Sequence, residues 1–143
     1  MPPNVTRPCA FVFLRADDRV LVSEMRHPVD GVWYRPPGGG IEFRERAEDA
    51  ARRELHEELG ITADHLALLG VREEIFALSD GPYHEIVFVY ESWLPHDALA
   101  ALDGKAIVED DRDVEIARVV SLADLRARRF TPLYPERVLE LLD

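Results

Sequence analysis

The sequence predicts a mixed α/β sandwich formed by a single domain, residues 1–143. A chain of this length matches one domain and can bury a core. Hydrophobic residues make up 47% and charged residues 31%, an ordinary globular composition that argues against disorder of the whole chain. Apolar runs of strand length are interspersed with hairpin breaks and a few helical patterns, and this combination indicates mixed α/β architecture.

The first part of the chain is rich in predicted strands. Residues 8–15 and 19–24 are apolar runs separated by a short polar break, which predicts a hairpin. Residues 32–35 form a further short candidate strand. The Pro/Gly-rich stretch 35–40 that follows is too short for a linker, so we expect a sharp loop inside the domain.

The middle of the chain predicts one helix and two strands. Residues 47–59 have a helical pattern, and Gly60 is a suitable C-terminal cap. Residues 67–78 and 83–94 are candidate strands joined by a strong turn signal. The second strand has apolar residues on both faces, so we expect it to be central and buried.

The C-terminal part is predicted from weaker signals. Residues 103–113 are rich in Asp and Glu and are expected to form a mobile loop. Residues 114–120 form the last predicted strand. Ser121 and Asp124 resemble a helix-capping pattern, and a final helix is expected over 135–142, because proline is favoured at the first helical position.

The charge balance bears on the class of partner. Lys and Arg total 17 and Asp and Glu total 28, which gives a net charge of −11. A chain this acidic is a poor candidate for binding a nucleic acid polymer or an anionic membrane, since both require a cationic surface. Acidic clusters can instead hold divalent cations, which can carry phosphate-rich substrates.

Cysteine usage and the N-terminal segment indicate a compartment. Cys9 is the single cysteine, so an intrachain disulfide or a cysteine-based zinc site is excluded. This favours a reducing compartment, and Cys9 itself, inside an apolar run, is expected to be an inert core thiol. We see no secretory signal and no apolar run of membrane-spanning length. The expectation is a cytoplasmic protein without a membrane partner.

The most informative segment is the predicted helix 47–59, which carries three glutamates on one arc. With Glu54 set at zero, Glu58 falls at about +40° and Glu57 at about −60° on the helical wheel. Carboxylates three and four residues apart repel each other, and they stand near the helix C-terminus, where the dipole disfavours anions. Mg²⁺ or Mn²⁺ would relieve both effects. The alternative is an ordinary solvated Glu-rich face.

A wider pattern surrounds these glutamates. Gly39, Glu45 and residues 53–61 match every fixed position of G-x5-E-x7-R-E-U-x-E-E-x-G-U, where U is a bulky aliphatic residue. This is the Nudix box, and the chain resembles the Nudix hydrolase family. The resemblance implies an α/β/α sandwich with a mixed sheet and a catalytic loop–helix–loop. It also implies Mg²⁺- or Mn²⁺-dependent hydrolysis of a diphosphate linkage, in a nucleoside diphosphate derivative or a nucleoside triphosphate.

Candidate metal ligands follow from the resemblance. Glu54, Glu57 and Glu58 would bind the metal. The backbone carbonyl of Gly38 or Gly39 is a further candidate ligand, because glycine allows a close approach of the backbone.

The remaining catalytic roles stay partly open. Arg53 would orient Glu57 or Glu45 through a fork-shaped hydrogen bond, which would make Glu45 a support of the loop. A carboxylate must remove the proton from the attacking water. The candidates are Glu57 within the box and Glu115 and Glu109 outside it, with Glu115 at the start of the last predicted strand and Glu109 in the acidic loop.

Candidate substrate contacts lie just before the glycine-rich loop. Arg26 and Arg35 could attract phosphate oxygens, and Trp33 or Tyr34 could stack on a base, a contact that contributes about 1–3 kcal/mol. Alternation along a strand would instead place one of the two aromatic rings in the core and the other at the rim.

The substrate subclass stays open. The secondary signatures that accompany ADP-ribose, diadenosine polyphosphate and NADH hydrolases are absent after the box, which lowers the weight of these three substrates. We expect a small nucleotide, and we leave open a homodimer. The alternative function is a catalytically silent Nudix-fold module that binds a nucleotide and regulates.

Overall fold

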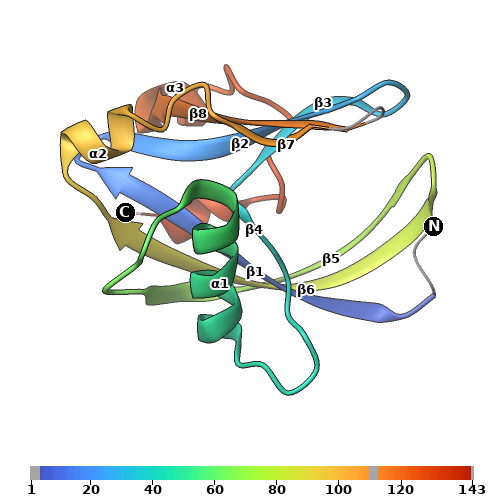
Figure 1. Cartoon of the computed structure of the whole chain (residues 1–143). Coiled ribbons are helices and arrows are strands. Elements are labelled where there is room, and N and C mark those ends of the chain that lie inside the picture. Colours follow the sequence, from blue (N-terminus) through green and yellow to red (C-terminus); the bar gives the residue numbers. More distant parts are fainter. Residues whose placement is uncertain (1–3, 110–112, 143) are drawn as a thin grey trace.

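The fold was described in a computed structural model that covers residues 4–109 and 113–142 (Figure 1). It confirms the mixed α/β class, with helices packed around a mixed sheet. The elements are β1 (Thr6–Ala16), β2 (Arg19–His27), β3 (Gly31–Arg35), β4 (Gly38–Gly40), α1 (Ala47–Leu59), β5 (Ala67–Leu78), β6 (Gly81–Trp93), α2 (His96–Ala100), β7 (Ala106–Glu109), β8 (Val114–Ser121), α3 (Leu122–Arg126) and a 3₁₀ helix, η1 (Val138–Leu141).

The sheet has the strand order β5-β6-β1-β2-β8-β7, with β4 paired to β1 and β3 paired to β2. β1 and β6 are parallel, and the other pairs are antiparallel. β1 pairs with β2 only over Leu14–Ala16, and β4 takes the place of β2 beside the earlier part of β1. The sheet therefore opens into two wings, which diverge from the β1–β2 hairpin in Figure 1.

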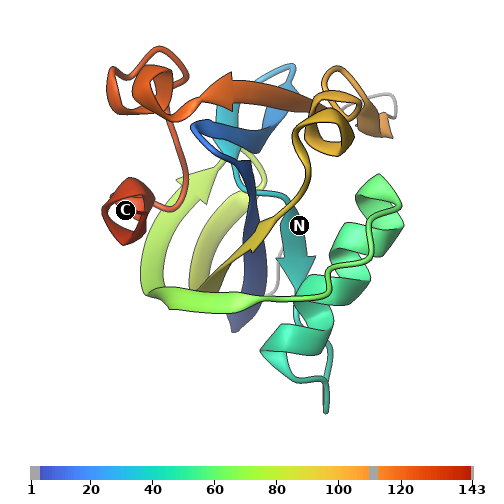
Figure 2. The ribbon, with the colours of Figure 1, turned by 90° about the vertical axis from the view of Figure 1, so that its left-hand side faces the viewer.

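Two hydrophobic clusters lie on opposite faces of β1, because successive side chains of a strand alternate. Ala10, Val12 and Leu14 belong to the cluster that contains the buried face of α1. Cys9, Phe11 and Phe13 belong to a second cluster, which contains α3 and η1. Figure 2 shows α1 and the C-terminal helix on opposite sides of the wing formed by β1, β5 and β6.

Helix α1 has the bounds that the sequence predicts. Ala50, Ala51, Leu55 and Leu59 are its buried residues, and burial of a leucine side chain contributes roughly 1.5–3 kcal/mol. Gly60 ends the helix in the left-handed conformation, with φ of 68°, and its N–H is bonded to the carbonyl of His56. This burial fixes the side of α1 that faces the sheet and leaves its glutamates at the boundary of the core.

All six predicted strands are present. β6 is an interior strand, as predicted, although it stands next to the edge strand β5 and not at the centre of the sheet. The Ser121 cap is confirmed, since its hydroxyl accepts a hydrogen bond from the Asp124 N–H. Three local predictions were wrong. The glycine stretch forms the short strand β4, because its backbone pairs with β1. The acidic segment forms the strand β7 over Ala106–Glu109, which pairs with β8, while its residues 110–112 lie outside the described part of the chain. The last helix is only the 3₁₀ turn η1, since Arg137 before it has a positive φ of 63°. None of the helices in the described ranges is long and apolar enough to span a bilayer.

Candidate active site

Arg53 ties the loop before α1 to the helix. Its Nε and Nη2 donate to the two carboxylate oxygens of Glu45, each at 2.9 Å, and Nη2 also donates to the Gly40 carbonyl at 3.0 Å. One Glu45 oxygen accepts a further hydrogen bond from the Glu42 N–H at 3.0 Å. The hydrogen bonds from Arg53 are the main cause that lowers the pKa of Glu45 to about 2. The loop is therefore held by a charged, two-pronged contact, the strongest kind of protein hydrogen bond.

The third guanidinium nitrogen of Arg53 faces two of the predicted metal ligands. Nη1 donates to Glu54 Oε1 at 2.9 Å and lies 3.5 Å from Glu57 Oε2. The Glu54 side chain is largely covered, whereas that of Glu57 is 58% exposed. Arg53 thus offsets part of the repulsion between these carboxylates while also fixing Glu45.

The glycine-rich strand β4 packs directly against α1. A Cβ atom at Gly39 would lie 2.7 Å from Glu54 Oε1. At Gly38, where φ is 149°, a Cβ atom would overlap the backbone carbonyl of Ala10. Only glycine permits this approach of the backbone to the Glu54 carboxylate and to β1.

Glu58 is the carboxyl group of the site whose ionised form is least favoured. Both of its carboxylate oxygens are shielded from solvent, and no cationic side chain or backbone N–H of the described residues bonds to them. The neighbour that acts on Glu58 through hydrogen bonding is another carboxyl group, that of Glu54. Burial, followed by the nearby charge of Glu115, raises the pKa of Glu58 to about 9, although Arg35 acts in the opposite direction. The metal-free site therefore favours the protonated form of Glu58, and a bound cation would favour the ionised form.

Glu115 reaches this cluster from the last long strand. It is 3% exposed, and its carboxylate lies 3.4 Å from Arg35 Nη2. β8 runs antiparallel to β2, and this pairing places Glu115 opposite Met25. Glu115 is 57 residues from Glu58 in the sequence, so the sheet register, and no local spacing, brings the two together.

The four predicted substrate contacts do not share one site. Arg26 and Tyr34 both contact Glu24, a buried glutamate that the sequence analysis did not single out. Arg26 Nε donates to it at 2.7 Å and the Tyr34 hydroxyl at 3.3 Å. Trp33 and Arg35 alternate with Tyr34 along β3 and therefore point away from Glu24. The sequence offered one indication that Glu24 is buried, namely its position as a charged residue at the end of the apolar run 19–24.

The donor set suits a hard cation. Within residues 4–109 and 113–142, no three His, Cys, Asp or Glu side chains lie close enough together to form a preformed cation site. Glu54 and Glu57 are instead turned toward Arg53, whereas Glu58 bonds to no cationic side chain among the described residues. All the predicted side-chain donors are carboxylates, the ligands that Mg²⁺ and Mn²⁺ prefer. The residues therefore fit such an ion once Glu54 and Glu57 reorient.

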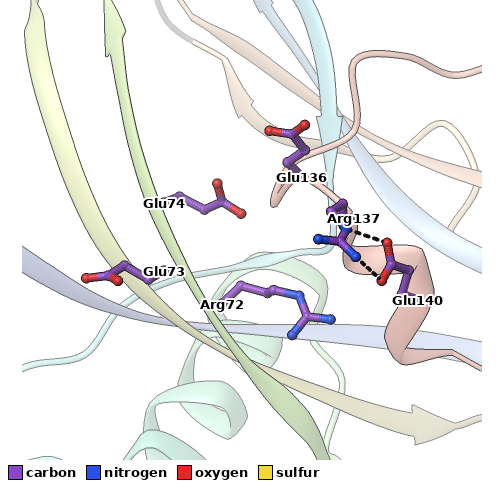
Figure 3. Close-up of a pocket in the computed structure, with 6 residues that line it drawn as sticks. All are labelled: Arg72, Glu73, Glu74, Glu136, Arg137 and Glu140. Atoms are coloured by element: carbon purple, nitrogen blue, oxygen red, sulfur yellow. Dashed lines mark hydrogen bonds and ion pairs between the residues drawn. The ribbon is translucent and has the colours of Figure 1, made fainter.

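The surface has two hollows, and only one of them is lined by a candidate metal ligand of α1. One, of about 360 Å³, runs along α1 beside Arg53 and Glu57. A larger one, of about 540 Å³, lies between β5 and the C-terminal segment (Figure 3), and no residue of α1 lines it. Its lining is wholly charged, and it contains the ion pair of Arg137 with Glu140. The hollow next to Glu57 is the one that adjoins the candidate site.

Comparison with known proteins identifies the family. The family model of the NUDIX domain matches residues 5–141, nearly the whole chain. The chain belongs to the Nudix family. This confirms the resemblance inferred from residues 39–61, and it extends the match to the strands on both sides of the Nudix helix.

Individual relatives agree with this assignment. A MutT NUDIX hydrolase from Burkholderia pseudomallei has a similar solved structure, with a TM-score of 0.72 and 26% identity, covering 98% of this chain and 100% of that chain. An ADP-ribose pyrophosphatase of Bacillus subtilis is 31% identical over 118 residues, and an RNA pyrophosphohydrolase of Novosphingobium aromaticivorans is 38% identical over 69 residues. These matches cover 80% and 48% of this Nudix chain, and 60% and 43% of the two curated relatives.

One predicted catalytic candidate lies outside the site as described. Glu109 is the last residue of β7, but its side chain and residues 110–112 are outside the part of the Nudix chain that the structure describes. Glu115 and Glu57 are the two candidate proton acceptors whose side chains the structure describes.

Proposed function

We propose that this Nudix chain hydrolyses a diphosphate linkage in a nucleoside diphosphate derivative or a nucleoside triphosphate, with Mg²⁺ or Mn²⁺ as its cofactor. The observation that carries the proposal is the solvent-shielded carboxyl group of Glu58, which bonds to no cationic group and stands next to the carboxyl groups of Glu54 and Glu115. Two relatives named for pyrophosphate hydrolysis support the reaction class. The intact box argues against the alternative of a catalytically silent regulatory module.

Four groups would hold the cation. Glu54, Glu57 and Glu58 would supply carboxylate oxygens, and Gly39 would supply its backbone carbonyl. When bound, the metal neutralises phosphate oxygens and lowers the pKa of the attacking water. Arg53 would then release its Nη1 contacts with Glu54 and Glu57 while its other nitrogens keep Glu45 in place.

We assign removal of the water proton to Glu115. Its carboxylate is held by Arg35 and lies close to Glu58, so it borders the position where the attacking water would stand. Glu57 is the alternative base, because its carboxylate is exposed and stands beside the hollow along α1. A correctly placed base contributes about 10²–10⁴ in rate.

The substrate is expected to be a small metal-bound nucleotide. Trp33 is half-buried on the same side of β3 as Arg35, so we propose it as the stacking residue for the base. Arg26 and Tyr34 are occupied with Glu24, and we do not assign them to the substrate. The two relatives are named for ADP-ribose and for RNA, so the name of a relative does not select one nucleotide.

The test is a panel of nucleoside triphosphates and diphosphate-linked nucleotides, assayed with Mg²⁺, with Mn²⁺ and with a chelator. We expect release of phosphate, pyrophosphate or nucleoside monophosphate only with metal, and loss of this release in Glu58→Gln. The RNA alternative is covered by including a 5′-triphosphorylated RNA. Nucleotide binding without hydrolysis under every metal condition would overturn the proposal in favour of a regulatory module.

A further inference from the structure

Arg35 is the side chain that joins the glycine strand to Glu115. It is the last residue of β3, and its side chain is only 16% exposed. Nη1 donates to the carbonyls of Pro36 at 3.3 Å and Gly38 at 3.2 Å, and Nη2 donates to Glu115 Oε1 at 3.4 Å. These contacts are all made within the protein, which differs from the substrate contact that the sequence predicts.

The Arg35 guanidinium also packs against a buried aromatic ring. Its central carbon lies 4.8 Å from the ring centroid of Phe11, which is 3% exposed on β1. A cation over an aromatic face is attracted by the negative potential of the ring. The Arg35 guanidinium thus lies over the Phe11 ring while its Nη1 and Nη2 atoms donate to the two carbonyls and to Glu115.

No strand pairing joins the glycine strand β4 directly to β8, the strand that carries Glu115. Among the described residues, β4 pairs with β1 and β8 pairs with β2 and β7, so β4 and β8 share no ladder. The sheet connects the Gly38 carbonyl to Glu115 only by way of β1 and β2, so a direct link between the two groups has to come from a side chain. Arg35 is the described side chain that donates to both.

We infer that Arg35 is a positioning residue, which holds the Gly38–Gly39 backbone and the Glu115 carboxylate in register around the candidate metal site. This inference rests on the proposed function. A planar fork can serve two acceptors at once, whereas the ammonium of lysine is a point charge that cannot reproduce the geometry. Groups that orient metal ligands typically change metal affinity or activity about 10–100-fold when they are removed.

The charge of Arg35 and its proposed positioning role predict different effects of Arg35 substitutions on Mn²⁺ affinity. Arg35 is positive and stands near Glu58 and Glu115, so by charge alone it repels a divalent cation. Arg35→Gln would then tighten Mn²⁺ binding, and Arg35→Lys would leave it unchanged. If Arg35 acts by position, both variants weaken Mn²⁺ binding, because both lose the fork.

The experiment is a titration of Mn²⁺ by electron paramagnetic resonance, without nucleotide, on wild type, Arg35→Lys, Arg35→Gln and Arg118→Gln. Arg118 is the matched control, since it also donates to a buried glutamate, Glu24, at 2.9 Å. We expect about 10–100-fold weaker binding in both Arg35 variants and unchanged binding in the control. Arg35→Lys keeps the charge near Glu115 and so provides the test if Arg35→Gln does not fold.

Kinetics with the identified nucleotide give a second readout. We expect both Arg35 variants to lower kcat about 10–100-fold with KM unchanged. The kcat losses of Arg35→Gln and Glu115→Gln should also be less than multiplicative in the double variant, because the two residues act as a unit. Melting temperatures measured alongside show that each variant is folded at the assay temperature.

Three outcomes would overturn the inference. They are unchanged or tighter Mn²⁺ binding in the Arg35 variants, a raised KM with kcat retained, and multiplicative losses in the double variant. A wild-type protein that binds Mn²⁺ but hydrolyses no nucleotide would overturn the proposed function instead, and the Mn²⁺ titration would still decide the role of Arg35.

Discussion

Arg53 donates two parallel hydrogen bonds to Glu45, from Nε to Oε2 and from Nη2 to Oε1, both at 2.9 Å. The two residues are eight positions apart, one in the helix and one in the loop before it. The contact fixes the loop on the helix that carries Glu54, Glu57 and Glu58.

Arg53→Lys should lower activity strongly, because lysine cannot make the two-pronged contact with Glu45. We expect a loss of kcat/KM of about 10–100-fold. Arg52→Lys is the control, since Arg52 makes an exposed pair with Glu48 on the same helix, and exposed pairs contribute little. Equal activity of the two variants would show that the fork is dispensable.

The Arg53–Glu45 contact also has a defined pH range. The folded-state pKa of Glu45 is lowered from 4.5 to about 2. The contact therefore contributes its full stability above pH 4.5 and loses it as the pH falls toward 2. Melting curves of wild type and Glu45→Gln should converge over this interval. A constant difference in melting temperature between pH 6 and pH 2.5 would contradict the assignment.

Glu58→Gln should make the metal-free protein more stable at alkaline pH. The folded-state pKa of Glu58 is raised to about 9, so its proton is bound more tightly in the folded state, and wild-type stability falls as the pH rises from 4.5 toward 9. Glutamine removes this slope. We expect a melting temperature a few degrees above that of wild type at pH 8 and no difference at pH 4.

The same variant should lose the response to metal. Mn²⁺ should raise the melting temperature of wild type, since a ligand that binds the folded state stabilises it. Glu58→Gln should show little or no rise at the same Mn²⁺ concentration, and turnover should fall by orders of magnitude. An equal Mn²⁺ shift in both proteins would remove Glu58 from the metal site.

Gly39→Ala and Gly38→Ala should have different effects, the first on Mn²⁺ binding and the second on thermal stability. At Gly39 the added Cβ meets the end of the flexible Glu54 side chain, so the protein should fold but bind Mn²⁺ more weakly. At Gly38 the Cβ meets the backbone of β1, so the melting temperature should fall strongly. Thermal melts and Mn²⁺ titrations separate the two effects. Unchanged Mn²⁺ binding in folded Gly39→Ala would mean that Glu54 moves aside without consequence.

The identity of the base is tested by three glutamine substitutions. If Glu115 removes the proton, Glu115→Gln should lower kcat by about 10²–10⁴ with little change in Mn²⁺ affinity. Glu57→Gln should lower both kcat and Mn²⁺ affinity, because Glu57 is proposed as a ligand. Glu109→Gln should change little. Near-normal turnover of Glu115→Gln across the pH range would transfer the role of base to Glu57.

The sequence alone determined the helical part of the site. The bounds of α1, its Gly60 cap and the shared arc of Glu54, Glu57 and Glu58 all follow from a periodicity of 3.6 residues per turn, which depends on neighbours in the chain. The Nudix box also placed the glycine stretch and Glu45 close to the helix. These relations span few residues, so local geometry fixes them.

Only the tertiary structure decided which distant groups meet the helix. Glu115 lies beside Glu58 because β8 pairs with β2 in one register, and a shift by one residue would turn Glu115 to the other face. The same rule separates Arg35, which reaches Glu115 and Gly38, from Tyr34, which reaches Glu24. Register is set by the packing of whole strands against the core, a property of the assembled sheet that no short sequence motif contains.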